Sequence, residues 1–267
     1  MKNNNLFSYQ PENPNQKIWQ VYPDPKSNFI ALEIKTKQQK QEQKNASQIV
    51  ILDTQKKEIF AIAEIEDTQM LVNFFNKIIL LSEIDFQNQM PLPKGLKALN
   101  IDFETIWEIE EVNYYGVIEE DKVVFSFQSN YYSLPLKFDD EELETKEEKY
   151  SNLKSKVNKY LYPTKQYLTN HINHKDISRF VFEKTNHKTE SCILYTENNN
   201  YLLCSYLVEN QDKEFDNYLL CTDKKGSLKN NFLIKKIENT KIKIPQELIL
   251  MENNILWINE NEFHFLK

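Results

Sequence analysis

The 267 residues include 40% hydrophobic and 27% charged side chains, which predicts a globular chain rather than a disordered one. The formal net charge of −7 argues against the basic surface that nucleic-acid binding needs. The segment Met1–Gln16 is polar and lacks the apolar core of a signal peptide, and the apolar run ending at Leu81 is too short to span a membrane. We therefore expect a cytoplasmic protein that contacts neither nucleic acid nor membrane.

Residue usage favours strands and constrains the turns. Aromatic residues reach 12%, with 14 Tyr and 16 Phe, and such side chains suit a half-buried pleated surface. With only 3 Gly, the turns must be made mostly by Asn, Asp and Lys. The cysteines Cys192, Cys204 and Cys221 have neither disulfide-framework nor metal-ligand spacing. We expect them to be buried, reduced thiols.

Short apolar or alternating runs, bounded by polar clusters, predict strands along most of the chain. In the first half these are Phe29–Ile34, Gln48–Asp53, Glu58–Ile62, Leu71–Phe75, Lys77–Leu81, Gly95–Ile101, Thr105–Ile109, Asn113–Ile118, Lys122–Gln128 and Tyr131–Phe138. In the second half they are Phe180–Glu183, Cys192–Thr196, Tyr201–Val208, Tyr218–Thr222, Leu228–Ile234, Glu247–Leu250, Ile255–Ile258 and Phe263–Leu266. A polar stretch from Lys35 to Ser47 is expected to be a solvated hairpin loop or disordered.

One charged segment breaks the strand pattern. Between residues 139 and 162, apolar side chains recur at helix-compatible spacing, for example Leu153 and Val157. The spacing predicts a helix over about Lys146–Tyr160, ended by Pro163, as an insertion between sheets or a hinge. Its charged face is expected to be solvated rather than an acidic partner site.

The chain also contains an internal repeat. A shift of 47 residues superimposes Ile51–Ile62 on Ala98–Ile109, with Asp53 on Asn100 and Phe60 on Trp107. A looser copy begins at Tyr218 and includes Asp223 and Gly226. Each copy is a strand that ends in Asp or Asn, then a tight turn, then a second strand, which carries a large aromatic residue in the first two copies. We expect the Asx side chain to cap the turn and the aromatic ring to pack between sheets.

A period in the forties is typical of a four-stranded propeller blade. The segments resemble the quinoprotein-type repeat, in which an Ala-Leu-Asp strand end and a turn with Thr-Gly precede a strand with Trp. Ala98-Leu99-Asn100 and Trp107 fit this pattern, although the turn is one residue short and lacks its Gly. The order of motifs further resembles an uncharacterised bacterial family, the domain of unknown function 4905. These motifs are Ile18-Trp19, the two repeats, Leu203–Leu207, the Asp223/Gly226 hairpin, and Leu256–Ile258 with Phe263–Phe265. The resemblance implies a propeller-like fold and supplies no activity.

The expected fold is therefore all-β and β-propeller-like, with about five or six degenerate four-stranded blades and one short helical insertion. We expect residues 1–267 to form a single domain, with the insertion at about 139–162.

The strongest candidate for a site is the histidine segment Thr169–Asp176. His171 and His174 are spaced i, i+3 and Asp176 follows, so a helix here would allow a metal site. The Asn-rich flanks instead indicate an exposed loop, and metal binding is the less favoured interpretation. In the last strand, His264 should face away from Phe263 and Phe265, where it is solvent-facing or hydrogen-bonded.

Other constellations lead to no catalytic residue. Nucleophile, phosphate-loop and dinucleotide motifs are missing, and three glycines could hardly build one. Adjacent acidic pairs are expected by chance among 40 acidic residues. A quinone would need a stacking Trp and cationic partners. The chain has one arginine, Arg179, and the dispersed Trp19, Trp107 and Trp257, which we assign to packing between sheets. No catalytic, cofactor-binding or cofactor assignment is made.

Three functions remain open. The leading one is a non-catalytic module that binds a protein partner or a ligand. The second is an enzyme with a site in the central channel. The third is an assembly module that docks through the 139–160 segment, and burial of Leu153 and Val157 on the protein's own sheet would weigh against it. The sequence leaves the oligomeric state open, and the parts that do not repeat are where we expect function: the Lys35–Ser47 loop, the charged insertion and the histidine segment.

Overall fold

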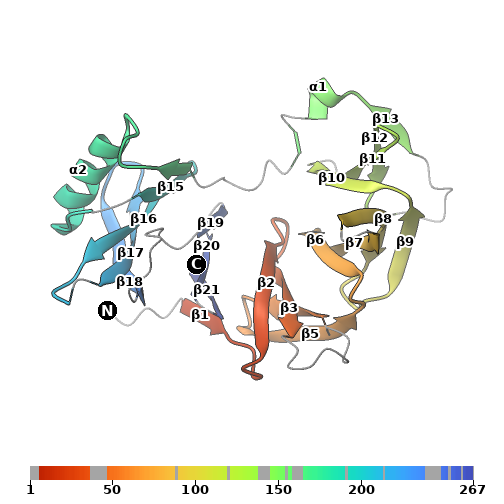
Figure 1. The fold of residues 1–267 in the computed structure, drawn as a ribbon, viewed down its shortest axis with the longest axis horizontal. Coiled ribbons are helices and arrows are strands. Elements are labelled where there is room, and N and C mark those ends of the chain that lie inside the picture. Colours follow the sequence, from red (N-terminus) through yellow and green to blue (C-terminus); the bar gives the residue numbers. More distant parts are fainter. Residues whose placement is uncertain are drawn as a thin grey trace. The chain divides into compact units, whose positions relative to one another are not determined.

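The structure is a computed structural model, which describes residues 6–36, 47–87, 90–118, 121–137, 145–153, 156–157, 165–189, 192–212, 214–237, 248–251, 254–259 and 261–266. These residues form antiparallel strands in five sheets, and two helices (Figure 1). The predicted mostly-β, propeller-like class is confirmed, with four sheets of four strands and one of five. The chain divides into two compact units: unit 1 is Met1–Gln10 with Leu161–Lys267, and unit 2 is Pro11–Tyr160.

Unit 2 contains three sheets, each made of four consecutive strands. The first is β2 (Gln16–Pro23), β3 (Phe29–Thr36), β4 (Ser47–Asp53) and β5 (Glu58–Ile65). The second is β6 (Gln69–Phe75), β7 (Ile78–Gln87), β8 (Met90–Leu99) and β9 (Thr105–Glu110). The third is β10 (Asn113–Ile118), β11 (Lys122–Phe127), β12 (Asn130–Pro135) and β13 (Lys146–Glu148). Strand β6 contacts both β2 and β10, so the first strands of the three sheets are neighbours (Figure 1).

Unit 1 contains two sheets. One has five strands in chain order: β14 (Lys165–Tyr167), β15 (Ile193–Glu197), β16 (Tyr201–Glu209), β17 (Phe215–Asp223) and β18 (Leu228–Ile237). The other joins β1 (Leu6–Tyr9) to β19 (Leu248–Met251), β20 (Asn254–Asn259) and β21 (Glu262–Leu266). Here β1 pairs antiparallel with β21, so an N-terminal strand completes a sheet of C-terminal strands.

Apolar side chains fill the spaces between neighbouring sheets. Ile49 and Ile51 of β4 pack against Phe74 of β6 and Leu81 of β7, which joins the first sheet of unit 2 to the second. The second sheet packs on the third in the same way through its other face. That cluster includes Phe75, Leu80, Leu96, Trp107, Val117, Val123, Phe125 and Leu134. In unit 1, Leu203, Leu219 and Cys221 of the five-stranded sheet meet Ile255 and Trp257 of the four-stranded sheet.

The predicted capping of the repeat turns is confirmed in all three copies. Asp53 Oδ1 accepts hydrogen bonds from two backbone N–H groups of its turn, and so do Asn100 Oδ1 and Asp223 Oδ1. As expected for a chain with so few glycines, non-glycine residues adopt positive φ at the turns. Asn76 (φ 51°) and Lys77 (φ 63°) form the β6–β7 turn in this way.

The predicted equivalence of Phe60 and Trp107 is wrong. In register, Ala98 lies opposite Trp107, whereas its repeat partner Ile51 lies opposite Ala61. The turn before β5 is one residue longer than the turn before β9, so Phe60 falls on the bulge of β5, the position that Ile106 takes in β9. Phe60 is 40% exposed, and its ring is edge-on to Phe29. Trp107 is buried and donates from Nε1 to the carbonyl of Leu136 at 3.3 Å. One residue of slippage in the turn therefore decides which side chain enters the core.

The helices differ from their predicted positions. The expected helix over Lys146–Tyr160 is wrong at its start, because residues 146–148 form β13, and α1 is the short Tyr150–Leu153. Leu153 is buried against Ile118 and Val124, and Val157 packs on the same cluster. These side chains lie on the protein's own sheet, which weighs against a free docking arm. Most of the remaining residues of the predicted insertion, and of the Lys35–Ser47 stretch, lie outside the described residues.

A second helix was not predicted. Helix α2 is His174–Thr185, where we expected an exposed loop followed by a strand over Phe180–Glu183, and that strand is wrong. Its buried side, with Ile177, Phe180 and Val181, follows helical spacing, and the short run around Phe180 fits a strand equally well until packing is known. Neither helix is long and apolar enough to cross a membrane, and the described residues contain no third helix.

One buried carboxylate connects the first two sheets of unit 2. Asp24 follows β2 and is 1% exposed. Its Oδ1 accepts from the backbone N–H of Lys26 (3.0 Å) and Asn76 (2.8 Å), and its Oδ2 accepts from that of Lys77 (2.9 Å) and from the Ser27 hydroxyl. The side-chain amide of Asn76 in turn donates to Oδ2 of Asp121, which directly precedes β11 of the third sheet, at 2.8 Å. The turns of all three sheets are thus hydrogen-bonded at one end of their first strands.

Removing this carboxylate should weaken unit 2. Asp24→Ala leaves buried N–H groups without acceptors, and we expect the free energy of unfolding to fall by about 3 kcal/mol. Asp24→Asn keeps one acceptor oxygen and should lose less. Denaturant titration followed by tryptophan fluorescence measures the effect. The control is Asp67→Asn in an exposed turn, which should change stability by no more than about 0.5 kcal/mol. Equal effects of Asp24→Ala and Asp67→Asn would contradict the role of Asp24.

Candidate functional site

The three predicted metal candidates lie close together in the chain but are engaged separately. His171 is exposed, its ring is edge-on to Tyr167 (4.9 Å), and its Nδ1 accepts from the backbone N–H of Asn173. His174 is the first residue of α2 and is buried. Asp176 pairs with Arg179 one turn later at 3.2 Å. Among the described residues, no group of three or more His, Cys, Asp or Glu is placed to hold a metal ion.

Helix α2 covers one face of the five-stranded sheet (Figure 1). Val181 is fully buried against Ile193, Cys204 and Tyr206, and this contact holds the helix on β15 and β16. The opposite face of this sheet packs on the four-stranded sheet of unit 1. A single helix of 12 residues, about 18 Å long, therefore covers a face that a whole sheet covers elsewhere.

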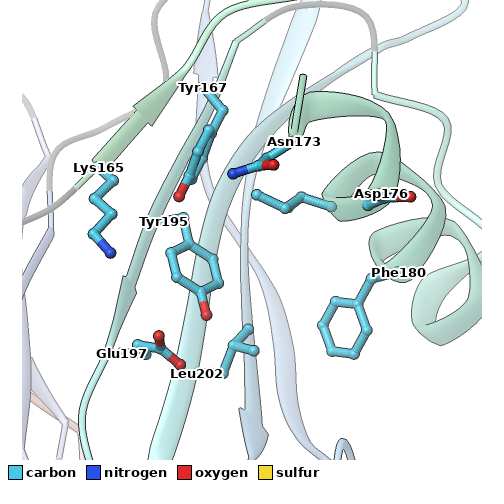
Figure 2. Close-up of a pocket in the computed structure, with 9 residues that line it drawn as sticks. Lys165, Tyr167, Asn173, Asp176, Phe180, Tyr195, Glu197 and Leu202 are labelled. Atoms are coloured by element: carbon cyan, nitrogen blue, oxygen red, sulfur yellow. The ribbon is translucent and has the colours of Figure 1, made fainter. Parts of the chain in front are cut away.

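A pocket of about 340 Å³ lies between the first turns of α2 and strands β14–β16. Its wall on the sheet side consists of strand residues, and its wall on the helix side comes from α2 and the residue before it (Figure 2). The lining residues are Lys165, Tyr167, Asn173, Asp176, Ile177, Phe180, Tyr195, Glu197 and Leu202. The pocket borders the histidine segment, although none of the three metal candidates except Asp176 lines it.

The floor of the pocket is apolar and aromatic. Tyr167 and Tyr195 are edge-on to each other at 5.9 Å and 70° between planes. Phe180 lies across from them on α2, with Leu202 between (Figure 2), and Ile177 also lines the pocket. These five side chains are half-buried, whereas the polar lining residues around them are exposed. The arrangement is a half-buried apolar floor within a polar rim, as in sites for small molecules.

The carboxylates at the rim are already paired. Glu197 forms an ion pair with Lys224 at 2.5 Å and accepts from the Tyr195 hydroxyl. The hydrogen bond from Lys224 is the main cause that lowers the pKa of Glu197. Burial, followed by the Glu197 hydrogen bond and charge, raises the pKa of Tyr195 well above its usual value. The Asp176 carboxylate points away from the tyrosines toward its own partner, Arg179 (Figure 2).

Hydrogen-bonded polar side chains tie the segment that follows α2 to the five-stranded sheet. His187 Nδ1 lies 2.9 Å from the hydroxyl of the fully buried Tyr206, which donates to Asn231 Oδ1 at 3.0 Å. Because the Tyr206 hydroxyl uses its proton in the hydrogen bond to Asn231, His187 Nδ1 must be the donor in its hydrogen bond to the Tyr206 oxygen. Burial raises the pKa of Tyr206 to about 12 and lowers that of His187. Both side chains therefore stay neutral at pH 7.

All three cysteines are free and buried, as expected. Burial raises the pKa of Cys221 to about 11 and also raises the pKa of Cys192 and Cys204. Since the thiolate is the nucleophile, the native thiols should react slowly.

An aromatic disulfide reagent at pH 8 should therefore leave the folded protein largely unmodified, because burial both covers the thiols and suppresses the thiolate. Three equivalents should react once guanidinium unfolds the chain, and the released chromophore measures both rates. Rapid modification of the native protein, at a rate close to that of the unfolded chain, would contradict this burial.

His264 is neither solvent-facing nor hydrogen-bonded, contrary to both expectations. It does face away from Phe263 and Phe265, and it stacks on Trp257 at 5.0 Å with 17° between planes. Within the described residues neither ring nitrogen has a hydrogen-bond partner, and Glu262 Oε2 is 3.7 Å from Nε2. Burial lowers the pKa of His264, which the nearby Glu262 charge only partly offsets.

This burial predicts a pH dependence of stability. Unfolded His264 takes up a proton near pH 6.5 while the folded side chain resists it, so stability should fall as the pH drops from 7 to 5. His264→Phe keeps the stacking and removes the unpaired nitrogens. We expect it to stabilise the protein by about 1–2 kcal/mol and to flatten the pH dependence, leaving the part due to His187. Urea titrations at pH 5 and 7 measure both effects. His171→Gln, at an exposed position, is the control and should retain the wild-type pH dependence. A His264→Phe variant as pH-sensitive as the wild type would contradict the prediction.

No model of a known protein family matches the chain, and no curated protein matches it. Among solved structures it is similar to the β-propeller domain of the Trilobed protease from Pyrococcus furiosus, with a TM-score of 0.36 and 9% identity over 94% of this chain and 80% of that chain. It is also similar to a eukaryotic initiation factor, with a TM-score of 0.31 and 11% identity over 91% of this chain and 52% of that one. Apo AztD from Citrobacter koseri gives a TM-score of 0.28 and 8% identity over 96% and 80%. TM-scores this low give no basis for assigning a function. The propeller-like organisation is established by the strand order of this chain's own sheets.

Sequence reasoning had singled out only part of the helix-side wall, because Asn173 and Asp176 belong to the histidine segment. Lys165, Tyr167, Tyr195 and Glu197 belong to no motif, and they come together only because β14 pairs with β15 in the register that places Lys165 opposite Tyr195. The helical spacing of Ile177, Phe180 and Val181 was the available signal for the rest of the helix-side wall.

Proposed function

We propose that this chain is a non-catalytic, cytoplasmic binding module that takes a small molecule in the pocket between α2 and β14–β16, hereafter the α2 pocket. The observation that carries the proposal is the pocket itself. Tyr167, Tyr195 and Phe180 surround an open pocket of about 340 Å³, and concave sites with an apolar floor and a few polar groups are typical of ligand binding. Filling this space with a ligand would complete the cover of the sheet.

The protonation states in the pocket favour binding over proton transfer. A general acid or base works best when its pKa is near the working pH. Here the pKa of Glu197 is lowered by Lys224, and the pKa of Tyr195 is raised by burial and by Glu197. Both groups therefore keep one protonation state around neutral pH. Such fixed polar groups suit the orientation of a ligand.

The thiols support the cytoplasmic assignment. Cys192, Cys204 and Cys221 are all free in the structure. Unpaired cysteines are typical of proteins in reducing compartments. A protein partner, the other form of a binding module, would need a surface that the α2 pocket does not supply, because the pocket is concave and small.

The proposal is tested by filling the pocket. Leu202→Trp places a larger side chain in the cavity, and we expect it to abolish binding of fragment-sized ligands identified by saturation-transfer NMR on the full chain. Phe180→Ala removes one wall and should weaken the same ligands by about tenfold. The matched control is Phe182→Ala on the same helix, which is 50% exposed and lies outside the lining, and it should bind normally.

Thermal melting of each variant checks that the fold is intact. If no fragment binds the wild type, or if the fragments bind equally well to Leu202→Trp, then the α2 pocket is not a ligand site.

A further inference from the structure

The α2 pocket presents hydrogen-bond donors that find no protein acceptor in the described part of the chain. Lys165 has no salt-bridge partner among the described residues, although its charge contributes to the lowered pKa of Glu197. Neither the Tyr167 hydroxyl nor the Asn173 side-chain amide has a hydrogen-bond acceptor in the part of the chain that is described. An ammonium group and a hydroxyl on alternate residues of β14 therefore face the same pocket (Figure 2).

Asn173 occupies a position where its side chain would ordinarily serve the helix. It is the N-cap residue of α2, yet its side chain makes no capping hydrogen bond. In Figure 2 the amide nitrogen of Asn173 is directed toward Tyr167, across the pocket. Asn173 and Tyr167 both line the pocket, so the amide is available to a ligand there.

The acceptors in the pocket, in contrast, are already in use. Glu197 is bound to Lys224 and Tyr195, and Asp176 is bound to Arg179. Each of these carboxylates has a positive partner, so the charge of Lys165 is left in excess. A ligand that offers acceptors and one negative charge matches this set better than a ligand that offers donors.

The floor adds a shape requirement. Tyr195 and Phe180 contribute rings to the floor, and Ile177 and Leu202 contribute aliphatic surface. A flat apolar group fits between such side chains and gains from contact with aromatic rings. The volume of about 340 Å³ is at the lower end of ligand pockets, which favours a small molecule over an extended chain.

Building on the proposed function, we propose that the α2 pocket binds a small organic acid, a carboxylate attached to a planar apolar group. The carboxylate accepts from Lys165, Tyr167 and Asn173, and the planar group lies on Tyr195, Phe180 and Leu202. A carboxylate matches these three donors because, when ionised, it is an acceptor only.

Three probes of nearly equal shape test the charge. These are phenylacetate, the neutral phenylacetamide and the cationic phenethylamine, titrated into the full chain by calorimetry or ligand-observed NMR. We expect phenylacetate to bind most tightly. Lys165→Met should weaken phenylacetate by about tenfold and leave phenylacetamide unchanged. Lys165→Glu should reverse the order in favour of phenethylamine.

Lys175→Met is the matched control, because Lys175 is an exposed lysine on α2 that does not line the pocket. It should bind all three probes as the wild type does. Lys165 is itself exposed, so its variants are expected to fold, and the melting temperature verifies this.

The outcomes separate this inference from the proposed function. Equal binding of phenylacetate and phenylacetamide, or preference for phenethylamine, with loss of binding in Leu202→Trp, would overturn the organic-acid inference and leave the binding module in place. The same holds if none of the probes binds while other fragments bind in a way that Leu202→Trp abolishes. If no compound binds in a way that depends on Leu202, both proposals fail.

Discussion

The sheets of this protein carry buried apolar side chains on both faces, so both faces of a sheet need a packing partner. In β4, Ile49 and Ile51 point to one face while Val50 and Leu52 point to the other, and all four are at most 1% exposed. A sheet of this kind is unstable alone, because a large apolar surface would remain in water. The second sheet of unit 2 meets the requirement by packing between two other sheets.

The five-stranded sheet of unit 1 meets the same requirement differently. One of its faces packs on a sheet, and the other is covered by α2. Because a helix contacts a sheet along a stripe, the residues beside that stripe stay half-buried. Tyr167, Tyr195 and Leu202 are such residues, and the α2 pocket is the space left above them. The candidate site is thus a consequence of how a two-faced sheet is covered.

Polar groups fix the positions of the turns that apolar packing leaves free. Asp24 accepts hydrogen bonds from its own turn and from the β6–β7 turn, and Asn76 extends the connection to Asp121. The Asx residues Asp53 and Asn100 cap their turns locally and take the place of the missing glycines. Burying a carboxylate such as Asp24 is tolerated because backbone N–H groups surround it.

The sequence by itself determined the features that depend on local chemistry. Alternating apolar residues located most strands, and Asp53, Asn100 and Asp223 cap their turns as predicted, because an Asx side chain bonds to the backbone a few residues away. The tertiary structure decided what depends on partners distant in the chain. Register placed Ala61 rather than Phe60 opposite Ile51, and packing on Ile193 and Tyr206 made residues 174–185 a helix. The α2 pocket belongs to this second group, since β14, β15 and α2 come from separate segments. No single segment contains its chemistry, and only the pairing of Lys165 with Tyr195 and the docking of α2 bring it together.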